Sequence, residues 1–191
     1  MYSGVGTVNK NIQYLLLCED KQTECFMRYF LYAHNIHRRK IKSLPWSAGS
    51  GSGEQYVRKC YPKELHNLRK RKVSCALFVC IDADAQTVEA RRKQLADECV
   101  EQKEPNRQSN EAVAIFMPKR NIETWIQWLG GNTDVNEDKA YPHAIGKESK
   151  CKPEAKKLAD MFIQNKNLDS ALSSMQYAKD EYDKLNIIIA K

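Results

Sequence analysis

Three acidic residues follow short apolar runs in this sequence. Glu19 comes directly after residues 12–18 (IQYLLLC), and Asp82 and Asp84 come after residues 73–81 (VSCALFVCI). Because Asp82 and Asp84 are two residues apart, their side chains leave an extended segment on the same side and can converge on one ion. Two carboxylates about 4 Å apart repel by roughly 4 kcal/mol at an effective dielectric constant of about 20, and a divalent cation would reverse that repulsion. Oxygen ligands of this kind favour Mg²⁺ or Mn²⁺.

Acidic residues after strands are also common turn formers, so the surrounding elements decide whether these three can meet. Residues 12–18, 73–81 and 112–117 are short and nearly all apolar, as expected for buried strands of a parallel sheet, and 40–44 is a weaker fourth strand. In an open parallel sheet, ligands bind beyond the carboxyl ends of the strands. The three acidic residues fall at such ends.

The segments between the strands have helical character. Three of them show helical periodicity or strong helix formers: residues 23–34, 86–102 and 122–129. Thr23 and Asn121 are the expected caps of the first and last of these. Residues 54–72 are also helical in composition, but Pro62 predicts two short helices or a bend. We therefore expect an α/β fold with a mainly parallel four-stranded sheet flanked by helices.

The chain is expected to form one α/β domain over residues 1–150 and a helical extension over residues 151–191. Two amphipathic helices, at 153–165 and 168–185, are predicted to pack on the domain or on a partner. Of the 191 residues, 42% are apolar and 29% are charged, which is typical of a soluble globular protein. No apolar run approaches the roughly 18 residues of a membrane span, and no secretory signal is visible, so we expect a cytoplasmic protein.

Other residues with metal or phosphate chemistry are less convincing. The seven cysteines are odd in number and contain no CxxC pair, so neither a disulfide framework nor a structural zinc is expected. His34 and His37 have no further Cys or His at zinc spacing nearby. The glycine-rich segment 47–54 lacks a Walker lysine and is expected to be a flexible loop.

The basic residues are concentrated in one segment. Residues 38–72 contain eleven Lys and Arg against Glu54 and Glu64, a charge of +9, while the whole chain carries +7 and the remainder therefore −2. This concentration favours a surface that binds DNA or RNA, although a solvated helix face has the same composition. The candidate nucleic-acid-binding residues are Arg38, Arg39, Lys40, Arg69, Lys70, Arg71 and Lys72.

The stretches LLLCEDKQTECF and FVCIDADAQT resemble the Toprim family, a catalytic fold shared by type IA and type II topoisomerases, bacterial primases and several small nucleases. The resemblance covers roughly residues 12–130. It implies that Glu19 is a general acid/base or metal ligand and that Asp82 and Asp84 hold Mg²⁺, as in a metal-dependent nuclease. The chain departs from the family at Asp20, where glycine is usual; this residue could alter the loop or add a ligand.

The stretch PKRNIETWIQWLGG is similar to one in small Toprim-like proteins, some of which accompany ATPases in bacterial anti-phage systems. The similarity implies that Glu123 joins the acidic cluster and that Arg120 faces phosphate, with Glu137 and Tyr141 as accessories. Glu123 could instead simply favour a helix N-terminus. The implied activity is cleavage of DNA or RNA with Mg²⁺ or Mn²⁺, and a larger ATPase is an implied partner.

The alternative is a non-catalytic or partner-regulated interaction subunit with a Toprim fold. Two amphipathic C-terminal helices and the apolar tail 187–190 are more than a small isolated domain needs, unless they pack on its own sheet. A homo-oligomer is compatible with either hypothesis, and neither involves a membrane.

Overall fold

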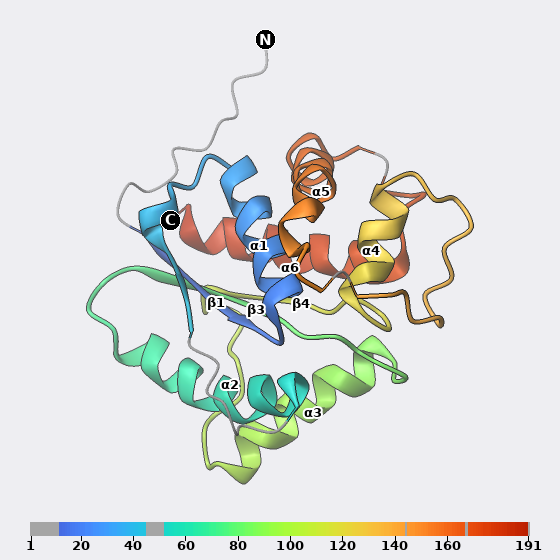
Figure 1. Cartoon of the computed structure of the whole chain (residues 1–191). Coiled ribbons are helices and arrows are strands. Elements are labelled where there is room, and N and C mark those ends of the chain that lie inside the picture. The colour runs from blue at the N-terminus through green and yellow to red at the C-terminus, as the bar shows by residue number, and fades with distance from the viewer. Residues whose placement is uncertain (1–11, 45–51, 144, 167, 191) are drawn as a thin grey trace.

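Four parallel strands form the centre of the structure (Figure 1). In chain order they are β1 (Gln13–Cys18), β2 (Ile41–Ser43), β3 (Cys75–Cys80) and β4 (Val113–Phe116). They lie side by side in the order β2-β1-β3-β4. The expected α/β fold with a four-stranded parallel sheet is confirmed. The computed structural model describes residues 12–44, 52–143, 145–166 and 168–190.

The sheet has a core layer on each face. All six residues of β3 and the four central residues of β1 are buried, because successive side chains point to opposite faces and both faces are covered. This explains why these strands are continuous apolar runs without alternating polar positions.

Helices cover both faces (Figure 1). One face packs against α2 (Gly53–Lys70) and α3 (Val88–Glu101). The other packs against α1 (Lys21–Ala33), α4 (Ile122–Leu129), α5 (Lys152–Gln164) and α6 (Ser173–Ile189). Two short 3₁₀ turns, η1 (Arg38–Lys40) and η2 (Glu148–Cys151), precede β2 and α5.

Of the two alternatives predicted at Pro62, the two short helices are wrong, because α2 is one helix with Pro62 inside it. Tyr56, Val57, Tyr61 and Leu65 are all buried on the face that packs against the sheet. Proline in a helix interior removes one backbone hydrogen bond at a cost of about 3 kcal/mol. Burial of these large side chains, each contributing roughly 1.5–3 kcal/mol, outweighs that loss.

The expected cap of the first helix is also wrong. The N-cap of α1 is Asp20, whose Oδ1 accepts a hydrogen bond from the Thr23 backbone N–H at 2.7 Å. Thr23 lies inside the first turn and is buried. Asn121 does occupy the N-cap position of α4, but its Oδ1 accepts from the Thr124 hydroxyl at 3.0 Å and bonds no backbone N–H of the helix.

The two C-terminal helices pack on the molecule's own sheet. α5 lies against α1 and α6 lies along β4. The ring of Phe30 in α1 meets those of Phe116, Phe162 and Tyr182 with centroids 5.5–5.7 Å apart. α6 begins at Ser173, later than expected, where the Glu137 carboxylate accepts from the Ser173 hydroxyl at 2.7 Å. None of the described helices has the length and apolar composition needed to cross a membrane.

Candidate acidic site at the carboxyl edge of the sheet

Glu19 and Asp82 meet at the carboxyl edge of the sheet. β1 and β3 are neighbours in register, with Cys18 opposite Cys80, so the residues that follow the two strands emerge side by side. The Glu19 Oε2 accepts a hydrogen bond from the Asp82 backbone N–H at 3.0 Å. The two strand ends that the sequence predicted to meet are therefore in direct contact.

The loops after β3 and β4 are tied together beside these residues. Ala83 donates its backbone N–H to the Pro118 carbonyl at 2.9 Å, and Asp84 and Arg120 form an isolated antiparallel bridge. Both Asp84 (φ 54°) and Arg120 (φ 71°) are in the left-handed region. Non-glycine residues there cost roughly 1–2 kcal/mol each, so the fold holds this pair in place against local strain. Arg120 is thereby placed beside Asp84.

Asp84 is directed at a buried guanidinium. Its Oδ2 contacts Arg91 Nη2 at 2.7 Å, and Arg91, which is only 2% exposed, also pairs with Glu54 at the start of α2. A third contact joins Arg91 to Gln94 Oε1 at 2.9 Å. Sequence reasoning missed both Arg91 and Glu54. The available signal was an arginine in the first turn of the helix that follows the Asp-x-Asp strand.

Glu123 reaches the same edge from the first turn of α4. It is 5% exposed, and its Oε1 lies 2.6 Å from Nδ1 of His143. The Asp20 Oδ2 lies 3.9 Å from the same ring nitrogen. Asp20 therefore has two contacts, the cap of α1 and the side of this histidine. The sequence carried no signal for His143, which comes from a loop 20 residues beyond Glu123.

The carboxyl groups raise one another's pKa. Burial raises the pKa of Asp82 well above its ordinary value, and the charges of Glu19, Asp20, Glu123 and Asp84 raise it further. Burial also raises the pKa of Glu19, to about 7, although the hydrogen bond from Asp82 opposes the shift. The pKa of Glu123 is raised, again mainly by burial. The edge therefore contains more acidic groups than its own cations compensate.

The donors fit a hard cation, although they are not grouped as a finished site. Within the described residues, no three His, Cys, Asp or Glu side chains are close enough together to hold a metal ion as they stand. Asp84 is paired with Arg91, and Glu123 is paired with His143. Asp82, however, has a buried Oδ1 with no hydrogen-bond partner. An orphaned carboxylate oxygen among raised-pKa acids is the environment that a cation would stabilise.

Gly53 fixes the backbone of Glu19. A Cβ atom at Gly53 would lie 2.2 Å from the Glu19 carbonyl oxygen and 2.7 Å from its Cγ. Only glycine allows α2 to begin this close to the end of β1. A cavity of about 230 Å³ is lined by Glu19 together with Cys18, Asp20 and Ser43 among others. Most of the glycine-rich loop, residues 45–51, lies outside the described part of the chain.

The seven predicted basic residues of segment 38–72 lie at the opposite edge of the sheet from the acids, unlike Arg120. Arg38, Arg39 and Lys40 form η1 ahead of β2, and residues 69–72 precede β3, whereas the acids follow the strands. β3 has six residues, so the two edges are about 20 Å apart at roughly 3.3 Å per residue. These cations and the acids cannot contact one phosphate together. Arg69 is moreover paired with Glu111 and Glu104.

The two accessory residues have structural contacts. Glu137 accepts hydrogen bonds at the start of α6, and the Tyr141 hydroxyl accepts from the Asn136 backbone N–H at 2.9 Å. The Tyr141 carbonyl accepts from the Asn121 side chain, also at 2.9 Å.

Comparison of the chain with protein-family models, curated proteins and solved structures gives no match.

Proposed function

We propose that the protein is a Mg²⁺- or Mn²⁺-dependent nuclease with a Toprim-type site, acting on DNA or RNA. The observation that carries the proposal is the Asp82 carboxylate, which is buried, lacks a partner for Oδ1 and is surrounded by four further carboxyl groups. Such groups destabilise a protein, and they are concentrated where parallel sheets bind ligands. The sequence resemblance to the Toprim family supports the step from a cation site to phosphodiester cleavage.

Asp82 and Glu19 would hold the metal, joined by Asp84 once it is released from Arg91. Bound there, Mg²⁺ would supply positive charge that polarises the scissile phosphate and stabilises the leaving oxygen. If Glu19 instead stays outside the metal shell, its carboxyl group, whose pKa burial raises to about 7, would act as general acid/base near neutral pH. Arg120, beside Asp84, is the cation best placed to contact the phosphate.

The remaining basic residues would bind the polyanion at a distance from the cleaved bond. Because they contact phosphates and not base edges, they would position the nucleic acid without selecting a sequence. The similarity of residues 118–131 to proteins of bacterial anti-phage systems leads us to propose such defence as the setting, with a larger ATPase as regulator.

The test is cleavage of supercoiled plasmid, single-stranded DNA and tRNA by purified protein in Mg²⁺, Mn²⁺ or EDTA. Wild type should cleave at least one substrate only with metal, and Asp82→Asn should lose activity by more than the roughly 10–100-fold expected for an outer-shell change. Glu101→Gln, which removes an exposed acid from α3, is the matched control. Metal-independent cleavage, or equal activity in wild type and Asp82→Asn, would rule out the proposed site.

A further inference from the structure

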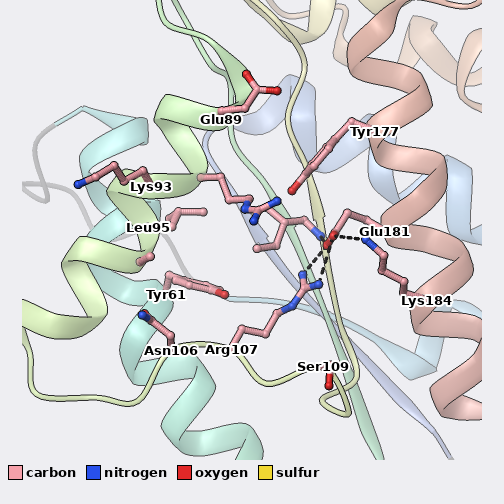
Figure 2. Close-up of a pocket in the computed structure, with 13 residues that line it drawn as sticks. Tyr61, Glu89, Lys93, Leu95, Asn106, Arg107, Ser109, Tyr177, Glu181 and Lys184 are labelled. Carbon is pink, nitrogen blue, oxygen red and sulfur yellow. Dashed lines mark hydrogen bonds and ion pairs between the residues drawn. The ribbon is translucent and has the colours of Figure 1, made fainter.

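A second concave site lies away from the acidic edge, beside the outer edge of β4 (Figure 2). It is a cavity of about 640 Å³ between α3, α6 and the loop that precedes β4. This volume is within the range of roughly 300–1,000 Å³ that small-molecule sites occupy. Nothing in the proposed nuclease mechanism uses it.

The floor of the cavity is an ion pair that belongs to the fold. Arg107 pairs with Glu181, which is 2% exposed and also accepts a hydrogen bond from the Ile115 backbone N–H at 3.2 Å. Lys184 lies 3.7 Å from the same carboxylate (Figure 2). Glu181 is therefore neutralised and occupied, and it offers little to a ligand.

Two tyrosines enter the cavity from different elements. Tyr61 comes from α2 and Tyr177 from α6, and both direct their hydroxyl groups into the space (Figure 2). The Tyr177 hydroxyl is buried and makes no hydrogen bond of good geometry. Leu95 and Ile115 add apolar surface between them. A mainly apolar, aromatic wall that also carries tyrosine hydroxyl groups free to form hydrogen bonds suits a planar ring with polar edges.

The charged rim has an excess of cations. Four Lys and Arg line the cavity against two acids, Glu89 and Glu181. Lys93 pairs with Asp97 at 2.6 Å, but Arg92 forms no ion pair within the described residues. Arg92 lies near the Tyr177 hydroxyl, where its charge lowers the pKa of a tyrosine that burial raises. It is thus a guanidinium with unused donors at the mouth of an aromatic pocket.

We propose that this cavity binds a free nucleoside phosphate. The base would lie against Tyr177, with the Tyr61 hydroxyl group at the inner end of the space, and the phosphate would contact Arg92, with Lys93 and Lys184 as nearby positive charge. Glu89 limits how much negative charge the mouth tolerates, which favours a mono- or diphosphate over a triphosphate. Its carboxylate is also an acceptor for a ribose hydroxyl or an exocyclic amine.

The test is calorimetric titration of the full-length protein with AMP, ADP, ATP, adenosine and inorganic phosphate, all in EDTA so that no metal occupies the acidic edge. AMP or ADP should bind, and Arg92→Gln should weaken that binding by about tenfold. Tyr177→Phe should weaken the binding of ADP with little loss of stability, since its buried hydroxyl makes no hydrogen bond of good geometry. Lys156→Gln, which removes an exposed cation from α5, is the matched control. Asp82→Asn should bind as wild type does, which separates this proposal from the nuclease.

Any of the following results would overturn the assignment. One is no binding of AMP or ADP at millimolar concentration by a protein whose circular dichroism is native. Another is binding that Arg92→Gln leaves unchanged. The third is inorganic phosphate binding as tightly as ADP, or an oligonucleotide that displaces ADP more strongly than ATP does, because the pocket would then recognise a bare anion or a nucleic-acid end.

Discussion

The Asp82 carboxylate costs stability in the position where it is found. Its pKa is raised by burial and by four neighbouring acids, and one of its oxygens has no partner. If stability alone had been selected, the side chain at position 82 would be uncharged or paired with a cation. A site that binds a metal cation explains the lower stability, because the bound cation would compensate the buried carboxylate.

The pH dependence of Glu19 provides a direct measure of this cost. In the unfolded chain its pKa is near 4.5 and in the folded protein about 7, so wild type loses stability as the pH rises through this window. Glu19→Gln mimics the protonated acid. It should therefore match wild type near pH 4 and exceed it by about 3 kcal/mol at pH 8. Urea unfolding in EDTA at several pH values would measure the difference.

Addition of Mg²⁺ should reverse this order at pH 8, because the ion stabilises wild type and the variant lacks one ligand. A Glu19→Gln variant that is less stable than wild type at pH 8 in EDTA would show that the carboxylate is compensated by the protein itself. The proposal that uncompensated carboxylates create a cation site would then be contradicted.

Among the individual residues of the site, the sequence predicted the acids but not the side chains that pair with them. Glu19, Asp82 and Asp84 were visible because each follows an apolar strand, and strand ends in a parallel sheet share an edge. Arg91 and His143 were not visible, since their roles depend on the path of α3 and of a loop that has no periodicity. The separation of the basic segment from the acids was open to prediction, because residues 69–72 precede the strand that Asp82 follows and all four strands are parallel.

The junction between β1 and α2 depends on a single missing side chain. Gly53→Ala would bring a methyl group to 2.2 Å from the Glu19 carbonyl oxygen, so α2 or the strand end must move. We expect a loss of about 1–3 kcal/mol in unfolding free energy and a larger loss of nuclease activity. Gln55→Ala, an exposed change in the same first turn, should be nearly neutral. Equal effects of the two changes on activity would contradict the role given to Gly53.

The sequence predicted the secondary-structure elements well where the hydrophobic pattern determines them. It predicted them less well where tertiary packing determines them. All four strands were anticipated within a few residues. Pro62 misled because local propensity cannot count the side chains that α2 buries, and Thr23 misled because Asp20 was weighed only as a departure from glycine. Asp20 has a structural role that glycine could not fill, because its carboxylate caps α1.

At the scale of the whole molecule, His34 links the first helix to the last. Its Nδ1 lies 2.8 Å from the Tyr182 hydroxyl, its Nε2 is buried without a partner, and burial lowers its pKa to about 4. The unfolded chain, with a pKa near 6.5, binds the proton more readily, so stability falls as the pH drops from 6.5 towards 4. Relative to His34→Gln, wild type should lose about 2 kcal/mol between pH 6.5 and pH 5.

Urea unfolding at these two pH values measures the loss, and His37→Gln, a change to an exposed histidine at the N-cap of η1, is the control. A wild-type protein and a His34→Gln variant with parallel pH curves would show that the histidine reaches solvent before the domain unfolds.

The buried Glu181 joins the C-terminal helix to the sheet. Glu181→Ala leaves Arg107 without its partner and the Ile115 N–H without an acceptor, so we expect a loss of about 3–5 kcal/mol in unfolding free energy. Asp180→Ala, an exposed change on the same helix, should be close to neutral. In a double-mutant cycle, Arg107→Ala should add little to Glu181→Ala; fully additive losses would mean that the two charges are not coupled.

The same carboxylate has a consequence for how molecules of this protein behave towards one another. A parallel sheet has two outer strands whose free backbone groups can recruit a strand from another chain. Here β2 offers only three residues, and along β4 the side chain of Glu181 takes the place that a neighbouring strand's carbonyl would fill. Loss of Glu181 would reopen that border, and the variant should then form β-rich aggregates that increase with protein concentration, while wild type stays dispersed.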